Sequence, residues 1–265
     1  RQHPVLLTQG LWLAETACTQ ALWRAVLGDD PSDFKGPERP VEQVSWEDIL
    51  ERFLPALNER VPGLAARLPT EAEWEYACRA GTTTPFSFGE QLTTDQANYD
   101  GNYPYPGGEK GAYRQHTVEV MALPANAWGL YQMHGNVYEW CQDWLGDYPK
   151  HLVEDPIGPS AGRERVLRGG YWYCFAWLCR SAFRYAHEPA CRALDIGFRL
   201  ARGPSPQAGQ EPGKQAGGAG AAGTGAGGGA PATEPGVPAP RRQGGRDRDA
   251  KEPGPLRRLL DRLRK

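Results

Sequence analysis

The stretch that most constrains the architecture of this chain is Arg67-Leu-Pro-Thr-Glu-Ala-Glu-Trp-Glu-Tyr-Ala77. Thr70 followed three positions later by Glu73 is a capping-box pattern, in which each side chain accepts a hydrogen bond from the backbone N–H of the other residue. This pattern predicts that a helix begins after Thr70. The predicted helix carries Trp74 and Tyr76 in its first two turns.

Outward from this helix, capping residues and apolar spacing predict short elements separated by irregular chain. Two further helices are expected over 19–26, with Thr19 as the N-cap, and over 45–54, where Ser45 and Asp48 repeat the capping box. Residues 81–124 are rich in Gly, Pro, Asn and Thr, which predicts long loops held by an anchored scaffold. Strands are expected over 11–14, 129–140, 165–173 and 197–201. The class is therefore α+β and loop-rich.

The last 63 residues differ sharply in composition from the rest of the chain. Residues 203–265 hold 15 of the 33 glycines, 9 of the 24 prolines and no aromatic residue. Such a segment cannot bury a core, so residues 203–254 are predicted to be a disordered linker. Residues 255–265 place leucines at helical spacing among arginines, which predicts a short basic amphipathic helix that contacts a partner or an anionic surface.

Charge divides the chain at the same boundary. Of 30 Lys and Arg and 32 Asp and Glu, 11 and 6 fall in residues 203–265, which leaves 19 and 26 in residues 1–202 and a net charge of −7 there. An acidic surface argues against nucleic-acid binding by residues 1–202. No apolar run reaches the roughly 20 residues that span a bilayer. No serine elbow or phosphate-binding loop supports a hydrolase or a nucleotide-binding protein.

The compartment stays open at this stage. Six cysteines scattered through residues 1–202 are sparser than in a small disulfide scaffold, which favours the cytoplasm. The sequence starts at Arg1 rather than Met, so the absence of a signal peptide from it does not decide the compartment.

Six segments, in a fixed order, carry a resemblance to a known family. They cover nearly all of residues 3–202 and resemble the formylglycine-generating-enzyme (sulfatase-modifying factor) family, which implies an enlarged C-type-lectin-like fold for residues 1–202. The segments are Pro40-Val-Glu-Gln-Val-Ser-Trp46, the stretch from Arg67 to Ala77, Gly129-Leu-Tyr131, Gly135-Asn-Val-Tyr-Glu-Trp140, Arg165-Val-Leu-Arg-Gly-Gly170 and Gly197-Phe-Arg-Leu200.

Residues 171–195 concentrate aromatic side chains in chain with little helix or strand periodicity. Aromatic residues are usually buried, so a loop that packs into the core is one interpretation. Tyr and Trp also offer large contact areas with few rotatable bonds, which favours a recognition surface as the other interpretation.

The same region is similar to the variable region of diversity-generating-retroelement target proteins. The fixed framework of those proteins matches Arg168-Gly-Gly-Tyr-Trp172, Arg180-Ser-Ala-Phe-Arg184, Pro189-Ala-Cys-Arg192 and Ile196-Gly-Phe-Arg199. The resemblance implies a display protein that binds an unknown protein or surface ligand and requires neither catalysis nor a cofactor. The ligand-binding positions that it implies are Tyr171, Tyr173, Cys174, Phe175, Leu178, Phe183, Tyr185, His187, Cys191, Ala193, Leu194 and Asp195.

An enzyme is the alternative. In formylglycine-generating enzymes an aromatic position after Gly-Gly is followed by two cysteines, with four residues between them, that bind copper(I) and form the catalytic pair. Cys174 and Cys179 match that spacing. Thiolates suit copper(I), which is a soft ion. Against this interpretation, Arg180 follows Cys179 directly, and the residues between the two cysteines are all apolar.

The family resemblance also implies a calcium site. Its oxygen ligands would come from Gln132, Gly135, Val137 and Glu139, with Glu139 supplying the carboxylate that calcium favours. The alternative is that this motif only builds a central strand. His116, His134 and His151 show no metal-ligand spacing and are expected to be ordinary polar or surface residues.

Overall fold

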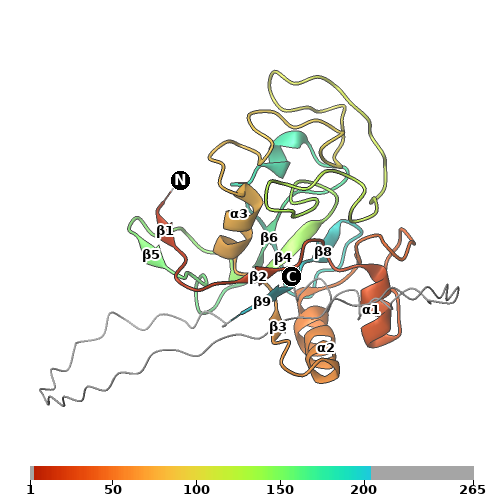
Figure 1. Cartoon of the computed structure of the whole chain (residues 1–265), viewed down its shortest axis with the longest axis vertical. Coiled ribbons are helices and arrows are strands. Elements are labelled where there is room, and N and C mark those ends of the chain that lie inside the picture. The colour runs from red at the N-terminus through yellow and green to blue at the C-terminus, as the bar shows by residue number, and fades with distance from the viewer. Residues whose placement is uncertain (1–2, 204–265) are drawn as a thin grey trace, which may run out of the picture. The chain divides into compact units, whose positions relative to one another are not determined.

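The structure, a computed structural model, describes residues 3–203 (Figure 1). The predicted linker over 204–254 and the predicted helix over 255–265 lie outside the described residues. The centre of the domain is a four-stranded sheet in the order β7-β6-β4-β8, in which β4 is antiparallel to β6 and parallel to β8. These strands are β4 (Tyr138–Trp144), β6 (Arg165–Arg168), β7 (Tyr185–His187) and β8 (Ile196–Phe198).

Two smaller sheets complete the strand inventory of residues 3–203. One has the order β2-β9-β3, and the other is a parallel pair of β1 with β5. Their strands are β1 (Val5–Leu6), β2 (Trp12–Leu13), β3 (Ala66–Arg67), β5 (Val153–Glu154) and β9 (Ala201–Arg202).

The capping patterns predict the helix starts correctly. Thr19 accepts a hydrogen bond from the backbone N–H of Leu22, and Thr70 and Glu73 form the reciprocal capping box. Ser45 and Asp48 also exchange backbone-to-side-chain hydrogen bonds, each 3.0 Å long, although the turns that follow widen into a π-helix. The helices are α1 (Gln20–Leu27), η1 (Asp48–Phe53), α2 (Leu54–Arg60), α3 (Glu71–Arg79) and η2 (Ala176–Cys179).

Three strand predictions need correction. The strand expected over 129–140 begins only at Tyr138, because Gly129, Gln132, Gly135 and Asn136 have positive φ angles and cannot extend a strand. The strand expected over 165–173 ends at 168, where two glycines with φ of 99° and 81° turn the chain. The stretch 197–201 divides between β8 and β9.

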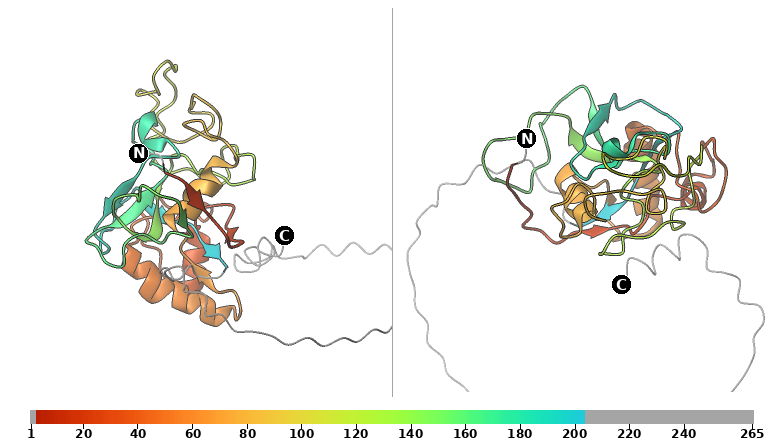
Figure 2. Two further views of the ribbon diagram at one scale, coloured as in Figure 1. Left: turned by 90° about the vertical axis from the view of Figure 1, so that its left-hand side faces the viewer. Right: turned by 90° about the horizontal axis from the view of Figure 1, so that it is seen from above.

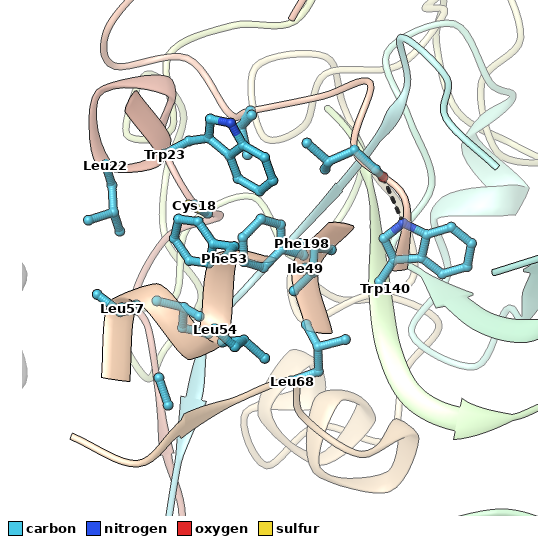
Figure 3. Packing of buried hydrophobic residues seen from close by; sticks show 14 of the residues in the cluster. Cys18, Leu22, Trp23, Ile49, Phe53, Leu54, Leu57, Leu68, Trp140 and Phe198 are labelled. Atoms are coloured by element: carbon cyan, nitrogen blue, oxygen red, sulfur yellow. Dashed lines mark hydrogen bonds between the residues drawn. The ribbon is translucent and has the colours of Figure 1, made fainter. Parts of the chain in front are cut away.

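The main core lies between the helices and the central sheet. Trp23 of α1 stacks on Phe53 at 5.0 Å, and Phe53 meets Phe198 of β8 edge to face at 5.2 Å (Figure 3). Trp140 of β4 is fully buried and donates its indole N–H to the carbonyl of Val44 (Figure 3). Within residues 3–203 no helix is long and apolar enough to cross a membrane.

Residues 81–124 hold no helix and no strand beyond isolated bridges, which confirms the predicted loops. Two perpendicular views show these loops, drawn in yellow to yellow-green, at the end of the domain opposite α2 (Figures 1 and 2). The teal segment around η2 lies at the same end, so the long loops share this end of the domain with the first part of the aromatic-rich segment (Figures 1 and 2).

Candidate functional site

Residues 171–195 leave the central sheet at Gly170, return to it as its edge strand β7, and lead into β8. Gly170 has a φ of 81°, and a Cβ on it would lie 2.7 Å from the sulfur of Cys179, so no side chain fits at this turn. The loop of residues 98–103 is joined to the segment by two backbone hydrogen bonds. Asp100 donates to the carbonyl of Cys174 at 3.0 Å, and Ala176 donates to the carbonyl of Tyr103 at 3.1 Å.

Exposed aromatic side chains alternate with buried small ones along this segment. Tyr173, Phe175 and Trp177 are 38%, 40% and 44% exposed, whereas Cys174 and Ala176 between them are buried. All three aromatic rings are therefore accessible to solvent, while the residues between them pack on the body of the domain. Folding stability alone does not favour this pattern, because an exposed ring does not gain the free energy that its burial would provide.

Further rings extend this surface. Tyr103, 52% exposed, lies 4.3 Å from Phe175 between ring centroids. Tyr185, 46% exposed, stacks on Tyr138, and Tyr138 contacts Tyr171, which in turn contacts Tyr173. The name aromatic face is used below for five exposed residues: Tyr103, Tyr173, Phe175, Trp177 and Tyr185.

The predicted ligand-binding positions divide into three groups by burial. Tyr173, Phe175 and Tyr185 are exposed. Half-buried positions, some of them packed against the core, are Tyr171, Leu178, Phe183, His187, Cys191, Ala193 and Leu194. Cys174 and Asp195 are buried, so as arranged they are not positions of direct contact; Asp195 instead accepts a hydrogen bond from the hydroxyl of Tyr173 at 2.9 Å. Trp177, which belongs to the aromatic cluster noted in the sequence, and Tyr103 are exposed members outside the predicted ligand-binding positions.

Arginines of the framework tie the segment to helix α3. Arg184 donates two hydrogen bonds of 2.6 Å to the carboxylate of Glu71, at the start of α3. The fully buried Arg168 donates to Glu71 at 2.7 Å and to Glu75 at 2.6 Å. Tyr148 adds a hydroxyl donor to Glu71 at 3.0 Å. The carboxylate of Glu71 therefore binds both β6, the strand before the segment, through Arg168, and the segment itself, through Arg184.

Two further arginines pair with acids elsewhere in the domain. Arg192 donates to both oxygens of Asp48, at 2.6 and 2.7 Å. Burial favours the neutral acid, but the hydrogen bonds from Arg192 and Ser45 prevail and hold the pKa of Asp48 well below its usual range. Arg199, fully buried, donates to both oxygens of Glu139. Ion pairs with acids of the body thus anchor the chain in and beside the segment, and the exposed aromatic side chains take no part in these ion pairs.

The two cysteines of the segment meet beneath the aromatic face. The sulfur atoms of Cys174 and Cys179 are 3.4 Å apart and not bonded, and both residues are buried. The backbone N–H of Tyr171 donates to the sulfur of Cys174. Burial raises the pKa of Cys179 well above its ordinary value, which disfavours the thiolate in this conformation.

His134, expected to be an ordinary polar or surface residue, is polar and buried. It is 1% exposed. Its Nδ1–H donates to the carbonyl of Cys179 at 2.8 Å, since a carbonyl can only accept, and its Nε2 accepts from the backbone and hydroxyl of Ser87. Burial lowers the pKa of His134 to about 4, so the ring is neutral at pH 7. The residue joins the loop 81–124 to the aromatic-rich segment.

The residues expected to bind calcium are engaged with other partners. Both carboxylate oxygens of Glu139 accept hydrogen bonds from Arg199, and one also accepts from Trp74. Gln132 accepts a hydrogen bond from Asn136 through its side-chain oxygen, and the carbonyl of Gly135 accepts from Val137. Among residues 3–203 no group of three His, Cys, Asp or Glu side chains could hold a metal ion. This donor set does not fit calcium as it is arranged.

Fold and site together define an α+β domain of the formylglycine-generating-enzyme type that carries an irregular, aromatic-rich segment at one end. The chain belongs to the family of sulfatase-modifying factor enzyme 1-like domains, whose sequence model matches residues 6–204. This confirms the family that the six sequence segments predict.

Enzymes of this family are similar to the chain in sequence. The formylglycine-generating enzyme of Mus musculus is 38% identical over 193 residues, which cover 68% of this chain and 49% of that protein. The formylglycine-generating enzyme of Streptomyces coelicolor is 36% identical over 192 residues and is covered to 58%. The chain thus spans about half the length of the curated relatives it matches.

Solved structures with this fold include proteins of other kinds. Treponema denticola variable protein 1 superposes with a TM-score of 0.65 and 32% identity, over 76% of this chain and 87% of that one. PvdO from Pseudomonas aeruginosa has a TM-score of 0.59 and 27% identity, over 72% and 79% of the two chains. The chain is therefore similar both to a variable protein and to formylglycine-generating enzymes.

Proposed function

We propose that residues 1–202 form a ligand-binding display domain, that the aromatic face contacts a protein partner, and that a retroelement diversifies residues 171–195. The observation that carries the proposal is the contrast within this segment. Arg184 and Arg192 of the segment, and Arg168 and Arg199 beside it, are held by ion pairs to the body of the domain, while four aromatic side chains of the segment are exposed. A scaffold fixed by some residues leaves the others free to change, as a diversified binding surface requires.

Similarity to Treponema denticola variable protein 1 supports this proposal at the level of the whole domain. The gene neighbourhood tests the diversification. We expect a reverse-transcriptase gene and a near-repeat of the DNA that encodes residues 171–199, with mismatches confined to adenines of the template. A neighbourhood with neither element would contradict diversification.

Binding is tested on the protein itself. A triple variant, Tyr173→Ser with Phe175→Ser and Tyr185→Ser, removes three exposed rings; because Tyr185 stacks on Tyr138 and Tyr173 donates to Asp195, circular dichroism must first show that the variant is folded. Quantitative proteomics of proteins retained by the immobilised full chain should find a partner that the triple variant loses. The matched control substitutes Tyr76 and Trp128 with serine, an exposed ring pair outside the segment, and should retain the partner. Equal retention by all three proteins would refute binding through the aromatic face.

A formylglycine-generating oxidase is the second candidate, and the adjacency of Cys174 and Cys179 favours it. Two sulfur donors in contact are of the type that copper(I) prefers, so these residues would hold copper, which supplies the oxygen-dependent redox chemistry when bound. The test incubates reduced protein with copper, oxygen and a peptide carrying the cysteine motif of sulfatases. Mass spectrometry should detect an aldehyde that Cys174→Ser abolishes; absence of product with wild-type protein would exclude this activity for the peptide used.

A further inference from the structure

The aromatic face has an uneven charge environment. Residues 171–195 contain three arginines, but Arg184 and Arg192 are bound to Glu71 and Asp48 and offer no free positive charge. Arg180 donates its Nε–H to the carbonyl of Trp177, within the segment. Arg184 and Arg192 therefore contribute to the fold rather than to the charge of the face, and of the three arginines only Arg180 keeps a charge that no acid among the described residues pairs.

Acidic groups at the face are not neutralised in the same way. Asp195 accepts from the hydroxyl of Tyr173, Asp100 accepts from Asn102, and Glu188 is exposed. None of these three acids takes part in an ion pair with another described residue. Asp100 and Asp195 are buried beneath the face, Glu188 is exposed, and residues 1–202 carry a net charge of −7, so the domain as a whole attracts cations.

Exposed rings attract cations by a second mechanism. The face of an aromatic ring carries negative partial charge, so an ammonium or a guanidinium group binds over it. The domain already uses this contact internally: the guanidinium of Arg165 lies 3.8 Å over Trp46 and 3.4 Å over Trp144, and that of Arg184 lies 3.9 Å over Tyr148. The five rings of the aromatic face have no such cation over them among the described residues. Each is therefore a site at which a cation of a partner could bind.

We propose that the partner of the aromatic face presents a segment rich in arginine and lysine. The inference rests on the proposed binding function and names the chemistry of the ligand. The rings contribute cation–π contacts and apolar area, and the unpaired acids steer the basic segment toward them. Tyr103, which lies outside residues 171–195, gives the face one ring that diversification of that segment leaves unchanged.

The experiment uses the full chain and three labelled peptides of twelve residues. One carries four arginines in a Gly-Ser background, one carries citrulline at the same four positions, and one carries glutamate. Citrulline keeps the shape of arginine without its charge, so it isolates the cationic contribution. Fluorescence anisotropy at low salt should show at least tenfold tighter binding of the arginine peptide than of the citrulline peptide, and no binding of the glutamate peptide.

Variants locate the site. Trp177→Leu and Tyr103→Leu preserve much of the apolar area but remove the ring, and each should weaken binding of the arginine peptide about threefold, as a cation–π contact at an exposed site implies. Trp128→Leu, outside the face, should leave the affinity unchanged. Every variant keeps the basic residues 241–265, so competition between these residues and the arginine peptide affects all comparisons equally.

Two results would overturn the inference: equal affinity for the arginine and citrulline peptides, or equal loss in Trp128→Leu and Trp177→Leu. If the proteomic experiment still finds a partner lost by the triple variant, a failure here rejects only the basic ligand and leaves the binding function standing. If that partner is absent as well, the binding function itself fails.

Discussion

The substitution Glu71→Gln tests whether the ion pairs of α3 hold the aromatic-rich segment in place. Glu71 is 5% exposed and accepts four hydrogen bonds, three from the guanidinium groups of Arg168 and Arg184 and one from Tyr148. Glutamine keeps the size of the side chain but removes its charge and turns an amide N–H₂ toward guanidinium donors. Arg168, fully buried, retains only Glu75 as a charged partner.

The size of the effect follows from burial. Breaking a buried ion pair by neutralising one partner costs about 3–5 kcal/mol. Arg184 is 21% exposed and Arg168 keeps a second acid, so the lower half of that range is expected. For a domain of this size each kcal/mol shifts the melting temperature by roughly 2–4 °C, so about 3 kcal/mol corresponds to roughly 6–12 °C.

Thermal and urea unfolding, followed by circular dichroism, measure the change. Glu51→Gln is the matched control, because Glu51 is exposed on η1 and has no ion pair with another described residue. It should change the unfolding free energy by less than about 0.5 kcal/mol. If Glu71→Gln lowers stability no more than Glu51→Gln does, the segment is held by other contacts and the reasoning about the framework arginines is wrong.

Three further predictions follow from single residues. Gly170→Ala should lower the unfolding free energy by about 1–3 kcal/mol more than Gly63→Ala in urea titrations, since both glycines have a φ of 81° but only Gly170 would crowd a sulfur atom; equal losses would contradict the crowding. Burial raises the pKa of Asp143 to about 7, above its value in the unfolded chain, so the contribution of Asp143 to stability is full below about pH 4 and is lost as the pH rises through 7. The variant Asp143→Asn cannot ionise, so its gain in unfolding free energy over wild type should grow from pH 4 to pH 8. A gain that does not change with pH would refute the raised pKa. Ellman's reagent should react rapidly with one thiol of the native protein, Cys191, and with all six in urea, because the other five cysteines are buried; rapid reaction of more than one native thiol would show that the dithiol is accessible.

Local patterns in the sequence predict local structure well. The capping boxes at Thr70 and Ser45 locate helix starts, because each pattern is complete within four residues. The strand expected over 129–140 fails for an equally local reason. Its apolar residues suggest extended chain, but Gln132 and Asn136 adopt left-handed backbone, and their side chains bind distant chain: Asn136 bonds to residues 98 and 118, and Gln132 to the carbonyl of Glu119.

The candidate site is predicted only in part. The aromatic composition of residues 171–195 identifies the segment, but the sequence does not separate exposed Phe175 from buried Cys174, since that alternation depends on which side of the segment packs on the body. The arginine pairs are also invisible in the sequence, because Glu71 and Arg184 are far apart along the chain. His134 gives no signal either, as a single histidine without ligand spacing does not reveal its burial.

The position of the last described strand has a consequence for the order of folding. Strand β9 is the middle strand of its sheet and pairs with both β2, near the start of the domain, and β3. The sheet therefore cannot close until residues 201–202 have been synthesised, and contacts that bridge nearly the whole domain slow the search for the native topology. Another 63 residues follow from Gly203, so β9 can leave the ribosome and pair while the chain is still attached to it. Folding of this domain is accordingly completed only after its last strand has left the ribosome, while the chain is still attached to it.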